Sequence, residues 1–270
     1  MSRLAVAALA MAVAVSLASG SASAHRTWIL PSSTVLSGED PWVTLDAAVS
    51  NELFVFEYRA LPLDDLSVTG PDGAAVPVEN PFVGKFRSSF DLNLGTPGTY
   101  RVAIARGGLS ARWRLDGKPG RWHGTRSELA AAIPRGAEEV QIWHYDNRTE
   151  TFVTVGAPTP VGEVPDATGL AMVIVGHPND LYAGETAELA FRMDGKPAAG
   201  LSVELVRGGR RHRADPGAIT LTTDAQGLVR ITWAEAGLYW IGAEIEGDDA
   251  DADGAIRHAR YSATLEVLPQ

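Results

Sequence analysis

The stretch AELAFRMDGKPAAGLSVELV, residues 187–206, indicates the fold. Its two runs of mainly apolar residues, 187–193 and 201–206, flank the turn-forming sequence Asp194-Gly195-Lys196-Pro197. Short apolar or alternating runs bounded by Gly, Pro and Asp predict β-strands joined by tight turns. The pattern continues on both sides, and it predicts further strands at 170–175, 219–222, 228–233, 237–245 and 259–267. Seven strands at this spacing predict an immunoglobulin-like or transthyretin-like β-sandwich.

The N-terminal half carries the same pattern less regularly. Strands are predicted at 28–31, 42–45, 53–56, 101–105 and 112–115, and a hairpin from 140–145 and 151–155 with its turn at Asp146-Asn147-Arg148. One short helix is predicted at 127–133, with Ser127 as its cap and Pro134 as its stop. A Pro/Gly-rich stretch at 157–162 predicts a boundary near Pro165. The sequence therefore predicts an all-β fold of two β-sandwich domains, residues 25–164 and 165–270.

Composition limits the classes of function. The chain has 270 residues, 45% of them hydrophobic, with a formal net charge of -10 and no cysteine. An acidic chain lacks the basic footprint that nucleic-acid binding needs, so we expect no nucleic-acid partner. Without cysteine there is no disulfide-linked partner, no thiolate metal site and no cysteine nucleophile.

The first 24 residues have the layout of a secretory signal peptide. A basic start at Arg3 precedes the apolar run 4–17, and Ala22-Ser23-Ala24 is a small-residue cleavage site. The alternative is a transmembrane anchor, but the apolar run is shorter than the roughly 20 residues that span a bilayer. We therefore expect the mature protein to be periplasmic or secreted.

Cleavage after Ala24 would make His25 the first residue. A free α-amine and the imidazole of the same residue can chelate one ion, and neutral nitrogen donors suit Ni(II), Co(II), Cu(II) and Zn(II). The alternative is that His25 follows the cleavage site without any role. The sequence thus predicts a transition-metal ion (Ni, Co or Cu) as the cofactor, with His25 as its first ligand.

The remaining histidines are candidates for further ligands, and they are His123, His144, His177, His212 and His258. A metal site needs three or four converging donors. His144 and Asp146 are two apart on a predicted strand, so they share a face. His177 lies near the predicted domain boundary, where ligand sites often form. His25, His144, His177 and Asp146 are therefore the predicted metal ligands, with a partly exposed strand residue and a loop residue as the alternatives for His144 and His177.

Other site types have weaker signals. No helical His pair of the metalloprotease type and no Gly-x-Ser-x-Gly turn is present in the sequence. The run from Asp249 to Gly254 has the opening spacing of a calcium loop, but Arg260 stands where an EF-hand needs Glu. This run is either a weak calcium-binding hairpin or a solvated acidic loop.

Several segments together resemble a bacterial secreted family of unknown function that is similar to the NikM-type periplasmic component of nickel and cobalt uptake. The segments are Ala24 to Pro31, Glu150 to Thr154, Gly156 to Pro158, His177 to Glu185, Asp194 to Pro197, Thr223 to Gly227 and Gly237 to Trp240. The resemblance implies export, a β-rich fold and transition-metal handling. NikM-type components are usually tied to the membrane, whereas this chain has no second hydrophobic segment.

These observations lead to a ranked set of functions. The first is a periplasmic binding protein for Ni, Co or Cu that feeds uptake through a membrane transporter or outer-membrane receptor, without enzyme activity. The second is a non-catalytic extracellular adhesion or scaffold module. The third is a copper oxidase that uses an N-terminal His.

Overall fold

The computed structural model describes residues 25–162, 168–209, 217–250 and 254–270. The predicted signal peptide and the predicted boundary at Pro165 lie outside these ranges, so both stay predictions. The described chain is almost entirely β-structure, and its single helix, α1 (Leu129–Ala132), is far too short to span a membrane. This confirms the predicted all-β fold class.

The strands form three sheets. The N-terminal sheet has the order β1 (Arg26–Pro31), β3 (Trp42–Ser50), β7 (Ser88–Asn93), β6 (Glu79–Val83), with β4 (Arg59–Ala60) also paired to β3. The C-terminal sheet consists of β11 (Leu170–Val175), β12 (Thr186–Met193) and β13 (Lys196–Pro197), with β16 (Leu228–Thr232) paired to β12. Both sheets pack against a larger third sheet.

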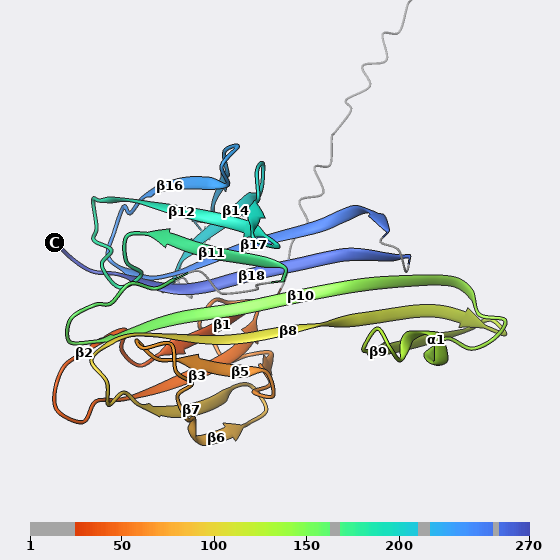
Figure 1. Ribbon diagram of the computed structural model, residues 1–270, viewed down its shortest axis with the longest axis horizontal. Coiled ribbons are helices and arrows are strands. Elements are labelled where there is room, and N and C mark those ends of the chain that lie inside the picture. The colour runs from red at the N-terminus through yellow and green to blue at the C-terminus, as the bar shows by residue number, and fades with distance from the viewer. Residues whose placement is uncertain (1–24, 163–167, 210–216, 251–253) are drawn as a thin grey trace, which may run out of the picture.

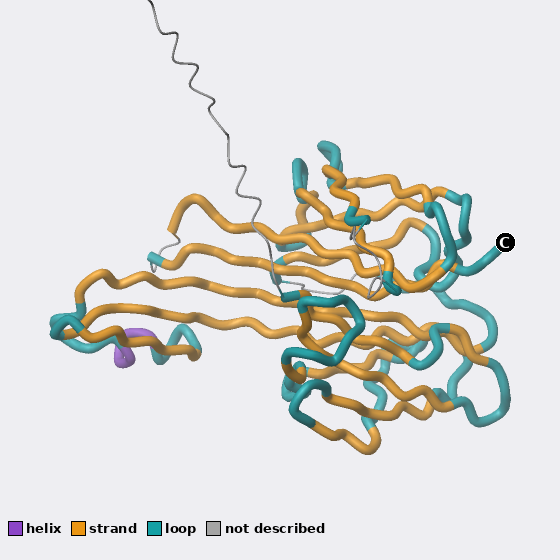
Figure 2. Tube along the Cα trace, turned by 180° about the vertical axis from the view of Figure 1, so that it is seen from behind, coloured by secondary structure: helices purple, strands orange, loops and turns teal. Residues whose placement is uncertain are grey.

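The central sheet takes strands from both halves of the chain. Its order is β15 (Ile219–Thr222), β14 (Ser202–Arg207), β17 (Gly237–Ala250), β18 (Ala255–Val267), β10 (Glu138–Val155), β8 (Gly98–Leu115), β5 (Leu66–Thr69), with β2 (Val35–Leu36) on β10 and β9 (Lys118–Gly124) on β8. Strands β10 and β18 run parallel to each other, and they join the two halves. The figures show these long strands side by side, with the two smaller sheets near one end (Figure 1, Figure 2).

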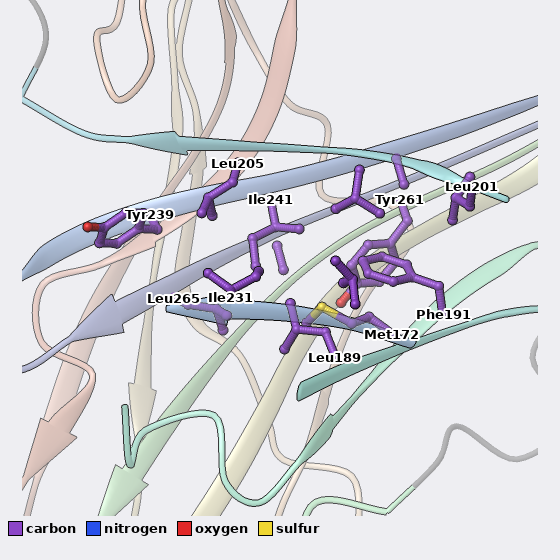
Figure 3. Packing of buried hydrophobic residues seen from close by; sticks show 14 of the residues in the cluster. Met172, Leu189, Phe191, Leu201, Leu205, Ile231, Tyr239, Ile241, Tyr261 and Leu265 are labelled. Carbon is purple, nitrogen blue, oxygen red and sulfur yellow. The ribbon is translucent and has the colours of Figure 1, made fainter. Parts of the chain in front are cut away.

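The two smaller sheets cover opposite faces of the central sheet. Val153 and Val155 of β10 belong to the core under the N-terminal sheet, together with Phe90. Phe152 belongs to the core under the C-terminal sheet, together with Tyr261. Successive strand residues point to opposite faces, so one strand serves both cores. The fold is thus two β-sandwiches that share a sheet, and Figure 3 shows the C-terminal core.

A third cluster of buried residues holds the first strand in place. Trp28 of β1 packs with Val206 and Trp240, and the indole N–H of Trp240 donates to the carbonyl of Thr27 (2.8 Å). Strand β1 is thereby fixed against β14 and β17.

The segment 53–56, predicted as a strand, is irregular instead. Phe54 has φ 62°, which breaks an extended strand. Its ring lies edge-on to Trp28 at 5.5 Å, so packing in the third cluster decides its conformation.

Two other predicted elements also differ. The hairpin with a turn at 146–148 is wrong, because β10 runs unbroken from 138 to 155. Strand β8 pairs with it in continuous register from Gln141 to Val155, which keeps the polar residues of the predicted turn in the sheet. Gly107 and Gly108 allow this, since side chains there would crowd Asp146 and Tyr145. The helix is shorter than predicted, and it begins without a side-chain cap.

An arm extends from the shared sheet. We use this name for residues 110–143, which comprise the outer half of β8, strand β9, helix α1 and the start of β10. In Figure 1 this part projects well to the right of both smaller sheets. None of its residues belongs to the three hydrophobic clusters of the described chain. The arm is therefore built outside the cores that stabilise the two sandwiches.

Candidate functional site

His25 is exposed, and it immediately precedes β1. Its ring stacks against that of Tyr58, with 4.0 Å between the centroids. Two residues later, the Thr27 hydroxyl accepts a hydrogen bond from Thr149 of β10 (3.0 Å). Thr149 and His144 are five residues apart on one strand, so they point to opposite faces. His25 and His144 therefore lie on opposite sides of the central sheet.

His144 and Asp146 do share a face, as predicted from their spacing. The Nε2 atom of His144 lies 3.8 Å from Oδ2 of Asp146. A cation already contacts this carboxylate, because Nη2 of Arg257 lies 2.7 Å from the same oxygen. Arg257 also pairs with Asp194 at 3.0 Å. The arrangement neutralises Asp146 and ties β10, β18 and the end of β12 together.

His177 is held by hydrogen bonds at both ring nitrogens. Its Nδ1 accepts from the backbone N–H of Asn179 (3.1 Å). In the neutral ring Nε2 then carries the proton and donates to the Thr99 hydroxyl (2.7 Å). Burial lowers the pKa of His177, which favours this neutral form. The histidine thus fastens the segment after the predicted boundary to β8.

The structure does not bring the predicted ligands together. The Thr99 hydroxyl that bonds His177 also contacts Thr154 of β10 (3.0 Å). Thr154 is ten residues from His144 on the same strand, a separation of about 33 Å. Only His144 and Asp146 are neighbours among the four predicted residues. In the described ranges, no group of three or more His, Cys, Asp or Glu side chains is placed to hold a metal ion.

The remaining candidates have separate locations. His258 pairs with Glu244, which also accepts from Arg260 (3.0 Å). His123 lies on β9, opposite Ser110 of β8. The predicted calcium run falls partly on residues 251–253, outside the described residues, so it stays untested.

The arm instead gathers basic residues on one face. Arg112 of β8 is the direct register partner of Arg121 on β9 and of Gln141 on β10. These three side chains therefore form one row across three strands. Arg114 and Pro119 form the next row toward the tip, and Glu139 reaches Arg114 at 3.2 Å from a bulge in β10. All four charged side chains are exposed.

A hollow of about 410 Å³ lies over these rows. Its lining consists of Arg112, Trp113, Arg114, Pro119, Gly120, Arg121, Glu139 and Gln141. The guanidinium of Arg112 stands over the Trp143 ring, 5.5 Å from its centroid. In the described part of the chain, no ion pair joins Arg112 or Arg121 to a carboxylate. The arm carries six Lys and Arg against four Asp and Glu, so it is positive on a chain of net charge -10.

The basic face of the arm is not among the sites predicted from the sequence, although the sequence carries a signal for it. Asp116-Gly117 joins β8 to β9, and both residues have positive φ (52° and 75°), as in the favoured two-residue hairpin turn. The alternation Arg112-Trp113-Arg114 on one side and Arg121-Trp122-His123 on the other then puts the basic residues on one face. The tryptophans face the other way, and the Trp113 ring lies over Gly120, where a Cβ would come within 2.3 Å of its nitrogen.

The fold and site define an all-β protein of two fused sandwiches with a projecting basic arm. The chain belongs to the DUF4198 family, a domain of unknown function whose sequence model matches residues 22–247. No curated protein matches the chain. Nothing in these matches links it to nickel or cobalt uptake, so that part of the resemblance stays a prediction.

The solved structures that match the chain have low identities and low TM-scores. The D0-D1 domain of intimin is 12% identical, with 90% of this chain and 99% of that chain covered and a TM-score of 0.22. A marsupial T cell receptor is 16% identical, with coverages of 91% and 74% and a TM-score of 0.22. The chicken CNTN1 FN1-FN3 domains are 6% identical, with coverages of 89% and 98% and a TM-score of 0.23. TM-scores this low carry no argument about function.

Proposed function

We propose that this protein is a non-catalytic, exported adhesion or scaffold module that binds an envelope component through its arm. The observation that carries the proposal is the separation between the arm and the cores. Residues 110–143 add nothing to the three hydrophobic clusters of the described chain, yet they build an ordered three-stranded extension. Because the arm is not part of the hydrophobic cores, its surface is available for binding.

The construction of the arm suits recognition. Its strands continue the register of the central sheet, from Gln141 to Val155 on β10 and from Gly98 to Arg112 on β8. A surface fixed on rigid strands loses little conformational entropy when it binds. The hollow between β8, β9 and β10 gives that surface a concave, charged contact.

The test is to remove the arm while keeping both sandwiches. Leu109 and His144 are direct register partners, so the turn sequence Asn-Gly can replace residues 110–143 as a two-residue hairpin. Cosedimentation with envelopes isolated from the producing bacterium is measured for both proteins, and circular dichroism checks the fold.

We expect the full chain to sediment with the envelopes and the shortened chain to stay in solution. The proposal is wrong if the full chain does not sediment, or if a folded protein without the arm sediments equally well.

The second candidate is carriage of Ni, Co or Cu by the mature N-terminus. It is favoured by the exposure of His25, whose ring and freed amine would both face solvent beside Tyr58. A membrane transporter or outer-membrane receptor would then be the partner. The test is titration with each metal salt, using protein verified to begin at His25.

Two variants serve as matched controls for the metal titration: His25→Ala, and the native chain lengthened by one N-terminal alanine. The added residue keeps the imidazole but moves the free amine, so chelation should weaken in both variants. Equal affinity in all three proteins would exclude this candidate.

A further inference from the structure

Two arginines face each other on the arm without a carboxylate between them. Arg112 and Arg121 are register partners on an antiparallel pair, where opposite Cβ atoms lie about 5 Å apart. Like charges directly opposite each other destabilise a strand pair. The third member of the row, Gln141, is neutral and does not relieve this repulsion. An oxyanion placed between the guanidinium groups would relieve it.

The surroundings of the row favour an anion of small size. Arg114 in the next row is already paired with Glu139 at 3.2 Å, so it limits the hollow on the side of the tip. The Arg112 guanidinium stands over the Trp143 ring, and this contact helps to hold it in place. The hollow of about 410 Å³ lies in the size range of small-ligand sites.

From this arrangement, and resting on the proposed function, we infer that the arm binds a carboxylated oligosaccharide of the envelope. Guanidinium forks bind carboxylates with two parallel hydrogen bonds. The Gln141 amide also lines the hollow, and it can donate to or accept from sugar hydroxyls.

A short acidic sugar fits better than a long or planar polyanion. With six Lys and Arg against four Asp and Glu, the arm has a formal charge of +2, whereas the whole chain carries -10. A nucleic acid or an anionic bilayer extends beyond the arm and would meet the acidic remainder of the protein. One or two charged sugar rings stay within the hollow.

The experiment measures the binding of trigalacturonate to the full chain at low ionic strength, by calorimetry. Maltotriose serves as the uncharged ligand, inorganic sulfate as the free anion, and phosphatidylglycerol vesicles as the anionic lipid. The test variant is Arg112→Gln/Arg121→Gln. Its matched control, Arg59→Gln/Lys85→Gln, removes the same charge from exposed positions near the N-terminal sheet.

We expect trigalacturonate to bind, maltotriose and the vesicles not to bind, and sulfate to bind more weakly. The Arg112/Arg121 variant should lose at least about tenfold in affinity without a fall in its melting temperature, and the control variant should bind like the native chain. The inference is overturned if trigalacturonate does not bind, if the Arg112/Arg121 variant binds equally well, or if the vesicles bind more tightly than trigalacturonate.

The envelope assay separates this inference from the proposed function. Envelope binding that needs the arm but tolerates the loss of Arg112 and Arg121 would overturn the saccharide site and leave the arm as the binding element. Envelope binding that does not need the arm would overturn both.

Discussion

Phe152 and Val153 are neighbours on β10, and they lie in two different hydrophobic cores. The Phe152 side chain is 3% exposed among the residues of the C-terminal core, and Val153 is fully buried in the N-terminal core. Because one strand supplies both cores, the two sandwiches are coupled through the backbone of the central sheet. Unfolding of one should expose the strand that the other needs.

Truncation of either residue should therefore destabilise the whole protein. We expect Phe152→Ala to cost about 3–5 kcal/mol and Val153→Ala about 2 kcal/mol of unfolding free energy. In both variants, calorimetry should show one transition that moves as a unit. Two separate transitions, with only one shifted by each substitution, would show that the halves unfold independently.

Glu150 is the most deeply buried charge that the structure describes. It is 0% exposed, 2.6 Å from Nη1 of Arg148, and it accepts a hydrogen bond from the Tyr261 hydroxyl (2.9 Å). Burial raises the pKa of Tyr261 well above its usual range, so the phenol stays a donor. Glu150→Gln should cost about 3 kcal/mol because it removes the fully buried carboxylate from its partly buried partner Arg148.

The milder variant Tyr261→Phe checks this account of Glu150, since it removes one hydrogen bond and should cost about 1–2 kcal/mol. Denaturant melts of both single variants and of the double variant would measure the coupling. If the two costs simply add, the hydroxyl and the carboxylate do not act together.

His177 should make stability depend on pH. Burial lowers its pKa in the folded protein below the ordinary value of 6.5. The unfolded chain therefore takes up the proton first, and stability should fall as the pH drops below about 6.5 until the native ring is also protonated. Above that pH the ring is neutral in both the folded and the unfolded protein, so the contribution of His177 to stability no longer changes with pH.

His177→Gln keeps a polar side chain but removes the titration, so the fall in stability below pH 6.5 should become shallower. Urea melts from pH 5 to 8 on both proteins would measure the difference. An unchanged or steeper slope in the variant would contradict the assignment of a neutral, hydrogen-bonded His177.

Replacing one of the facing arginines with an acid should stabilise the arm and block its binding site. In Arg121→Glu the like-charged pair with Arg112 becomes an opposite-charged pair, worth about 0.5 kcal/mol. The melting temperature should rise slightly, and trigalacturonate binding should be lost. A lower melting temperature would mean that Arg112 and Arg121 do not repel each other in the free protein.

Much of the C-terminal half was predictable from the sequence. The strands at 170–175 and 219–222 match the structure at both ends, because Gly, Asp and Pro turns mark their limits. The failures lie where tertiary contacts override local pattern. Asp146-Asn147-Arg148 looked like a turn, but pairing with β8 and the ion pair with Arg257 keep it in a strand.

The candidate site was less predictable, because its formation depends on strand pairing. Alternation correctly placed His144 and Asp146 on one face. It could not show that Arg257 from β18 would neutralise Asp146, or that His177 would bond Thr99 about 33 Å from His144. The row of Arg112, Arg121 and Gln141 needs the register of three strands, which no single stretch of sequence specifies.

The central claim is that the arm makes contact with the envelope through its basic face. The most direct measurement places a photo-crosslinking amino acid at His123, which lies on that face, or at Arg59, which is exposed near the N-terminal sheet. Irradiation with isolated envelopes should give cross-linked product from position 123 and not from position 59. Product from position 59, with none from 123, would contradict the account.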